Sequence, residues 1–164
     1  MGLDILAFEK VTLTEEHPTE DEDGEYCGDR DNHYYITGGR LGGLQAQRCY
    51  DTSGQEMHFR AGSYSGYSEW RNALSEVAVG VPADRAWNEP QKYSICPFYE
   101  LIDFSDCEGV IGPSVAHKLA RDFRIQRETV RPRLEDKGEW YAEQYDLWQN
   151  AFALAAGEGM VYFC

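Results

Sequence analysis

The sequence predicts an α+β fold, in which a mainly antiparallel sheet of about four to five strands packs against three helices. Segments with strand-like alternation come early in the chain, helical periodicity follows in its middle, and the last residues form the apolar segment MVYFC. The strict alternation of strand and helix that marks a parallel doubly wound sheet is not found in this order. The 164 residues are expected to form a single domain, residues 1–164, with its own apolar core.

Strands are expected over residues 3–14, 32–37 and 55–60, where apolar and polar residues alternate. The Gly-rich segment GGRLGG, residues 38–43, lies between the second and the third of these. It has neither the Lys-Ser/Thr of a P-loop nor a full G-x-G-x-x-G pattern, so it is predicted to be a flexible connection. The apolar residues 160–164 are expected to form a last strand inside the sheet.

Helices are expected over residues 68–79, 113–128 and about 136–156, because apolar residues recur there at helical spacing. Ser68 is the expected cap of the first helix, and a proline suits the first turn of the second. Residues 81–97 contain proline and show no periodicity, which predicts an irregular surface loop.

The chain is strongly acidic, with 29 Asp and Glu against 15 Lys and Arg and a formal net charge of −14. Residues 15–25 alone hold seven carboxylates, and residues 15–31 are predicted to be an acidic exposed loop. Such a charge repels phosphate backbones, so direct nucleic-acid binding is not expected, whereas a basic partner is favoured. The simplest role of the acidity is solubility. A calcium site in this loop is the other functional alternative, although the D-x-[DN]-x-[DN]-G spacing is not met.

Five cysteines are present, an odd number without a C-x-x-C pair. The first residues lack the basic region of a secretory signal, and no stretch approaches the ~18 apolar residues of a membrane span. Reduced thiols, a cytoplasmic location and no membrane association are therefore expected.

The first candidate site is the segment RAGSYSGY, residues 60–67, which is predicted to be a Gly-rich loop running into the first helix. Unpaired N–H groups at a helix start receive anions well, and arginines hold phosphate or carboxylate groups. The candidate ligand-binding residues here are Arg60, Ser63, Tyr64, Ser65, Tyr67 and Arg71. The alternative is a plain strand-to-helix turn whose tyrosines only pack.

The second candidate site is FSDCEGVIGP, residues 104–113, which also leads into a helix. Ser105, Asp106 and Glu108 supply polar groups for a ribose, a base edge or a metal ion, or else they cap the helix and bond the loop. Cys107 is expected to be a small buried residue. The four histidines show no metal-ligand spacing, so no metal, cofactor or assembled catalytic centre is predicted.

The segments MGLDI, AGSYSGYSEWR and FSDCEGVIGP resemble an uncharacterised family of small bacteriophage and prophage proteins. The resemblance covers the first strand and residues 59–123, but not residues 15–25 or the chain after residue 130. No assigned activity comes with it. It implies a phage accessory protein in the host bacterial cytoplasm, and such proteins often block a host defence protein or sequester its nucleotide signal.

Three hypotheses follow, in this order. The first is a non-enzymatic counter-defence inhibitor that binds a nucleotide-like small molecule in the two loops or blocks a basic host defence protein. The second is an interaction protein without a pocket. The third is a small nucleotide-processing enzyme, a hydrolase or transferase, that uses Asp106 and Glu108. The oligomeric state stays open.

Overall fold

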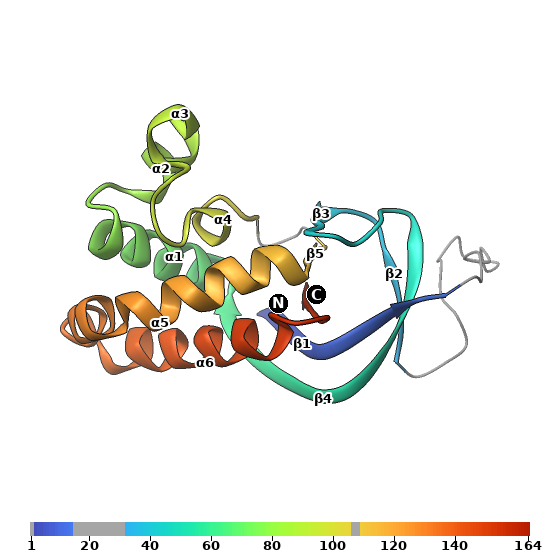
Figure 1. The fold of residues 1–164 in the computed structure, drawn as a ribbon. Helices are drawn as coiled ribbons and strands as arrows, with labels where there is room; N and C mark the ends of the chain where they lie inside the picture. The colour runs from blue at the N-terminus through green and yellow to red at the C-terminus, as the bar shows by residue number, and fades with distance from the viewer. Residues whose placement is uncertain (1, 15–31, 106–108) are drawn as a thin grey trace.

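The computed structural model describes residues 2–14, 32–105 and 109–164, and the structural statements below refer to these residues. A curled sheet and a group of helices lie side by side (Figure 1). The predicted α+β class is confirmed. The acidic loop predicted over residues 15–31 lies outside the described residues.

The sheet is mixed and has six strands in the described residues, in the order β2-β4-β1-β6-β5-β3. The strands are β1 Gly2–Leu13, β2 His33–Ile36, β3 Gly39–Arg40, β4 Arg48–Ser63, β5 Val110–Ile111 and β6 Met160–Phe163. All neighbours pair antiparallel except β3 and β5, which are parallel. The predicted number of four to five strands is too low because β3 and β5 have two residues each and carry no detectable alternation.

β3 corrects the prediction that GGRLGG is a flexible connection. Gly39 has φ +126°, and a Cβ atom there would lie 2.2 Å from the carbonyl oxygen of Val110 on β5. A glycine is therefore required for the two backbones to approach each other. The glycines of this segment mark a close strand contact as well as a turn.

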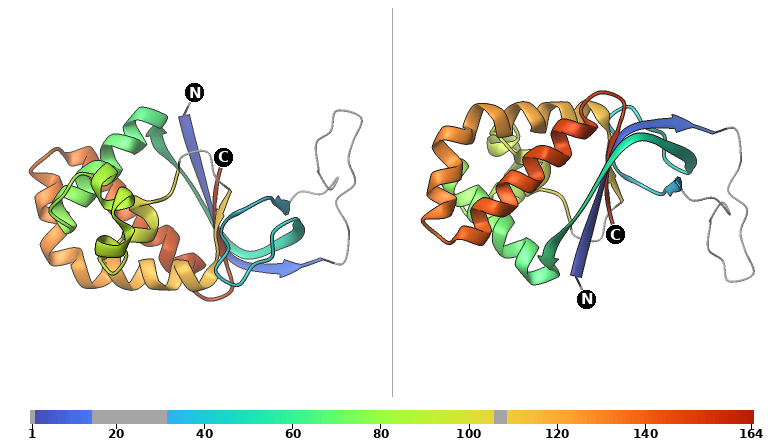
Figure 2. Two further views of the ribbon diagram at one scale, coloured as in Figure 1. Left: turned by 90° about the horizontal axis from the view of Figure 1, so that it is seen from above. Right: turned by 90° about the horizontal axis from the view of Figure 1, so that it is seen from below.

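β1 and β4 are the longest strands, and β6 lies against β1 on the other side. Residues Leu3, Ile5 and Ala7 of β1 are fully buried toward the helices. The opposite face of the sheet carries a second, smaller apolar cluster, formed by Phe8, Ile36, Tyr50, Val110 and Met160. The backbone of Asp4 exchanges two hydrogen bonds with Cys164, so the two ends of the chain lie side by side (Figure 2).

The described residues form six helices where the sequence predicts three. They are α1 Tyr64–Ala78, α2 Ala83–Asn88, α3 Pro90–Tyr93, α4 Tyr99–Ile102, α5 Pro113–Glu135 and α6 Glu139–Ala155. The predicted helices correspond to α1, α5 and α6. The short helices α2 and α3 occupy most of residues 81–97, which are predicted to be irregular, because four to six residues are too few to show a period.

The start of α1 differs most from the prediction. β4 runs directly into α1, whose cap is Ser63 rather than Ser68. The φ of +106° at Gly62 allows the abrupt change of direction. Tyr67 is fully buried and belongs to the apolar stripe of the helix. The segment predicted as a Gly-rich loop is thus the end of a strand followed by a first helical turn.

Trp148 on α6 lies at the centre of the main core. Its ring stacks on Trp70 of α1 at 5.7 Å and on Phe152 at 5.6 Å, and it meets Phe59 of β4 edge-on at 5.1 Å. α1, α6 and the sheet therefore share one aromatic cluster, which fixes the position of α1 relative to the sheet. None of the helices in the described part of the chain is long and apolar enough to cross a membrane.

Candidate functional site

The sequence places Arg60 and Arg71 in one candidate anion site, but in the structure these two side chains do not meet. Arg60 lies on β4, and its Nε and Nη2 atoms donate to the Asp4 carboxylate on β1 at 3.1 and 2.8 Å. The hydrogen bond from Arg60 lowers the pKa of Asp4 below its usual range. The adjacent Phe59 contacts Trp148, so Arg60 projects from the sheet face opposite the helices. The alternation of the strand thus separates it from Arg71, which lies on α1.

Ser63 is used structurally. Its Oγ accepts a hydrogen bond from the N–H of Gly66 at 3.0 Å, and it lies 3.0 Å from the Oγ of Ser65. Tyr64 is 39% exposed and faces the solvent. The arrangement of Ser63, Tyr64 and Ser65 fits a plain strand-to-helix turn better than a preformed anion site.

The two predicted motifs do meet at one point, the carbonyl oxygen of Phe104. The hydroxyl of the buried Tyr67 donates to it at 3.3 Å, and Nη1 of Arg71 donates to it as well. The Arg71 guanidinium lies 5.3 Å from the Tyr67 ring and 4.7 Å from the Trp87 ring. Both contacts are within cation–π range, so Arg71 is held between two aromatic rings.

A small hollow of about 290 Å³ lies beside this contact, lined by Arg71, Trp87, Asp103 and Ser105. Two predicted ligand-binding residues, Arg71 and Ser105, are therefore brought together here. Asp103 is bound by Arg40 of β3 at 2.7 Å. The other two predicted residues of this motif, Asp106 and Glu108, lie outside the described residues, as does Cys107.

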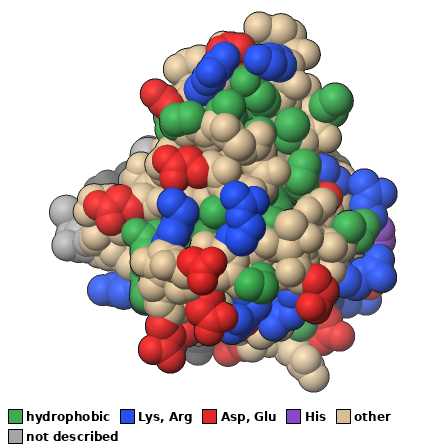
Figure 3. All heavy atoms as spheres, turned by 90° about the vertical axis from the view of Figure 1, so that its left-hand side faces the viewer, with side chains coloured by type: hydrophobic (Ala, Val, Ile, Leu, Met, Phe, Trp, Pro, Cys, Tyr) green, Lys and Arg blue, Asp and Glu red, His purple; other side chains and the backbone are tan. Residues whose placement is uncertain are grey.

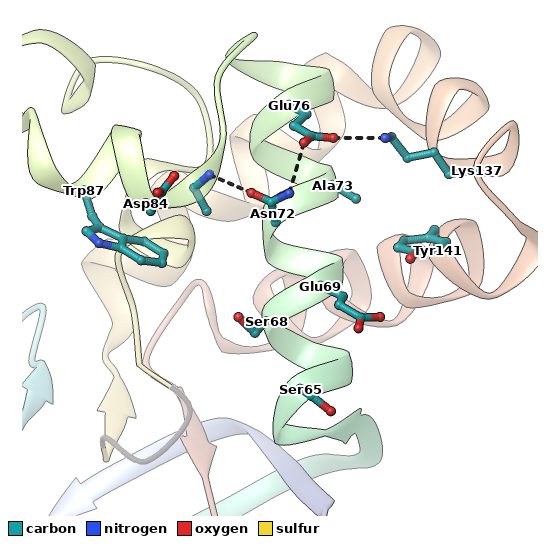
Figure 4. A pocket seen from close by; sticks show the side chains of 11 residues that line it. Ser65, Ser68, Glu69, Asn72, Ala73, Glu76, Asp84, Trp87, Lys137 and Tyr141 are labelled. Carbon is teal, nitrogen blue, oxygen red and sulfur yellow. Dashed lines mark hydrogen bonds and ion pairs between the residues drawn. The ribbon is translucent and has the colours of Figure 1, made fainter.

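A larger groove of about 710 Å³ crosses the outer face of α1 (Figure 4). α2 borders it on one side, and the α5–α6 turn with the start of α6 borders it on the other. Its lining residues are Ser65, Ser68, Glu69, Asn72, Ala73, Glu76, Ala83, Asp84, Trp87, Lys137 and Tyr141. Trp87 also lines the smaller hollow, so the two cavities are neighbours that share one indole ring.

The groove is acidic, because three carboxylates face one ammonium group. That ammonium group, Lys137 Nζ, is already bound to Glu76 at 3.0 Å, and Asn72 donates to the same carboxylate at 3.1 Å. Both interactions lower the pKa of Glu76, the one with Lys137 more strongly. The remaining carboxylates belong to Glu69 and Asp84. Within the described residues, the carboxylate of Glu69 has no hydrogen bond or ion pair.

α2 is fixed against α1 by the Asn72 side chain, whose Oδ1 accepts a hydrogen bond from the N–H of Ala83 at 2.9 Å (Figure 4). Ser75, buried in α1, also donates to the carbonyl oxygen of Val81 at 2.8 Å. These two bonds place Asp84 and Trp87 at the border of the groove. α2, which forms one side of the groove, is thus fixed to α1, which forms its base.

Most of the residues that line the groove are not among the site residues that the sequence predicts. Glu69 and Glu76 are seven residues apart and therefore share the polar face of one helix, a signal that the sequence contains. Trp87 and Tyr141 lie in separate segments, and no spacing connects them to α1.

Figure 3 shows the end of the molecule where α5 turns into α6, with acidic, basic and hydrophobic side chains interspersed over it.

No group of three or more His, Cys, Asp or Glu residues in the described ranges is arranged to hold a metal ion. No protein-family model matches the chain, and neither a curated protein nor a solved structure matches it. The function is therefore inferred from the geometry and charge of the groove.

Proposed function

We propose that this protein acts by binding, and that the groove across α1 holds a basic segment of a partner protein. The observation that carries the proposal is the lining of the groove, in which Glu69 and Asp84 have no cationic partner among the described residues and lie with two aromatic side chains, Trp87 and Tyr141. Carboxylates and aromatic faces together suit a guanidinium or ammonium group.

The same lining disfavours the nucleotide alternative at this place. The start of α1 presents N–H groups, which attract anions, but Ser63 already accepts one of them and Glu69 lies one turn further along the helix. A phosphate group here would meet the carboxylates of Glu69, Glu76 and Asp84, with the one lysine of the groove already bound to Glu76. Of the two binding modes that the sequence suggests, the basic protein partner is the one that the groove supports.

The open shape of the groove also suits a chain segment better than a small molecule. The groove lies open across α1 instead of enclosing a cavity (Figure 4). Exposed ion pairs contribute only about 0–1 kcal/mol each, and a cation over an aromatic ring contributes about 0.5–2 kcal/mol. Several contacts are therefore needed for useful affinity, which a segment with two or more basic residues supplies. The sequence resembles a family of small phage proteins. In a phage accessory protein, such binding blocks a basic host defence protein.

The test is isothermal titration calorimetry of the full chain with an Arg- and Lys-rich peptide and with an acidic peptide of equal length. The double variant Glu69→Gln/Asp84→Asn is expected to weaken binding of the basic peptide by about tenfold or more, which corresponds to ~1.4 kcal/mol. Glu128→Gln/Glu143→Gln is the matched control, since it removes the same charge from exposed positions of α5 and α6. Equal weakening by both double variants would show that only the overall charge acts, and the proposal would then be wrong.

A further inference from the structure

A second hollow, of about 320 Å³, lies between the outer surfaces of α5 and α6. It is lined by His117, Ala120, Arg121, Arg124, Gln149, Ala153 and Ala156. No carboxylate is among these lining residues, although the chain has 29 acidic residues against 15 Lys and Arg. The charge of this hollow is therefore opposite to that of the protein as a whole.

Its basic side chains come from one face of α5. His117, Arg121 and Arg124 follow each other at intervals of four and three residues, so they lie on successive turns, and all three are exposed. The guanidinium groups of Arg121 and Arg124 have no hydrogen bond or ion pair within the described part of the chain.

The next basic residues along α5 are arranged differently. Arg127 and Arg131 both bind Asp146 of α6, each at 2.9 Å. Lys118 binds Glu100 and Asp122. α5 thus uses these residues to hold neighbouring elements, whereas Arg121 and Arg124 are left to face the hollow.

Gln149 adds a further donor from α6. Its Oε1 accepts a hydrogen bond from Arg127, which leaves its amide NH₂ group as the end available to the hollow. Ala153 and Ala156 have small side chains and allow a ligand to approach the helix closely. α5 and α6 run antiparallel, so their dipoles largely cancel, and the side chains determine the local charge.

We propose that this hollow is a binding site for the phosphate group of a small anion, held by Arg121 and Arg124 with the Gln149 amide as an additional donor. Arginine pairs with phosphate through two parallel hydrogen bonds. A volume of 320 Å³ is at the lower end of the roughly 300–1,000 Å³ of small-molecule sites, which fits pyrophosphate or a nucleoside monophosphate. A long nucleic acid would instead extend over the surface of a chain with net charge −14, which repels it. This site is independent of the groove across α1.

The test uses calorimetric titration of the full chain, in a buffer without phosphate, with pyrophosphate, with AMP and with a ten-nucleotide single-stranded RNA. Saturable binding of pyrophosphate or AMP is expected, and Arg121→Gln and Arg124→Gln should each weaken it by about tenfold. Comparison of the two ligands shows whether the nucleoside contributes. Lys92→Gln on α3 is the control, because it removes one exposed positive charge that does not line the hollow.

Two results would overturn the site: no binding of either small anion, whether or not the RNA binds, or equal weakening by Lys92→Gln. Since Arg121 and Arg124 have no partner among the described residues, their variants should unfold at the same temperature as the parent protein. Thermal denaturation followed by circular dichroism checks this. The variant Glu69→Gln/Asp84→Asn should bind the small anion at least as tightly as the parent, which separates this test from that of the groove across α1.

Discussion

Arg131 on α5 binds both carboxylate oxygens of Asp146 on α6, with Nε 3.0 Å from Oδ1 and Nη2 2.9 Å from Oδ2. Arg127, one turn earlier, adds a contact of 2.9 Å to Oδ1. Burial by itself raises the pKa of Asp146, but the hydrogen bonds and the positive charges of the two arginines together outweigh it, so the pKa is lowered. This cluster joins the two longest helices along their common side.

Replacing Asp146 by Asn should therefore destabilise the protein. The substitution removes the negative charge that two partly buried arginines share and replaces one of its two acceptor oxygens by an NH₂ donor. Since all three side chains remain partly in contact with solvent, we expect the free energy of unfolding to fall by about 1–2 kcal/mol. Urea denaturation measures it. Glu143→Gln on the exposed side of α6 should change the value by less than about 0.5 kcal/mol. An equal effect of both variants would contradict the role of the cluster.

The same cluster predicts a stability that falls in acid. The folded-state pKa of Asp146 lies below the usual range of an aspartate. The unfolded state therefore binds the proton first, and the stabilisation is complete above about pH 5 and is lost as the pH falls through the folded pKa. The difference in unfolding free energy between the parent and Asp146→Asn should shrink between pH 6 and pH 3. A constant difference over this range would show that the ion pairs contribute nothing.

The cap of α1 gives a direct comparison of two serines. Ser63→Ala removes the acceptor of the Gly66 N–H at 3.0 Å and should lower the free energy of unfolding by about 1 kcal/mol. Ser68, the cap that the sequence predicts, lies inside the helix and is exposed. Ser68→Ala should leave stability unchanged or raise it slightly, because alanine is the better helix former. Chemical denaturation of both variants decides which residue is the cap.

Two glycines that follow α6 are expected to differ strongly in their response to substitution by alanine. A Cβ atom at Gly159 would lie 1.8 Å from the carbonyl oxygen of Phe8, whereas at Gly157 no atom lies within 4 Å. Gly159→Ala forces apart the backbones that bring β6 to β1 and should cost about 3 kcal/mol or more. Gly157→Ala should be close to neutral. Melting temperatures of the two variants provide the measurement, and similar values would contradict the close approach at Gly159.

Periodicity in the sequence was sufficient for the fold class, for β1, β2 and β6, and for the existence of α1, α5 and α6. It was not sufficient for β3 and β5, whose pairing depends on a close backbone contact at Gly39. The beginning of α1 was also missed, because Tyr64 and Ser65 stand between the Ser63 cap and the first buried residue of the helix, Tyr67, and conceal the apolar stripe.

The candidate site was predicted less completely than the fold. The sequence places Arg71 and Ser105 in two separate candidate sites and leaves open whether these share a cleft, and in the structure both line the same small hollow. The sequence groups Arg60 with Arg71 in the first candidate site, although strand alternation directs Arg60 to the other face of the sheet. The groove across α1 draws Trp87, Lys137 and Tyr141 from segments that only tertiary packing brings together.

The position of β6 has a consequence for the synthesis of this protein. Residues 160–163 join the strands β2, β4 and β1 to the strands β5 and β3. While the chain emerges from the ribosome, these two groups of strands have no common neighbour, and the edge of β1 that pairs with β6 lacks its hydrogen-bonding partner. The sheet is completed only after Phe163 has emerged, so we expect the newly made chain to be exposed to chaperones and proteases until that moment.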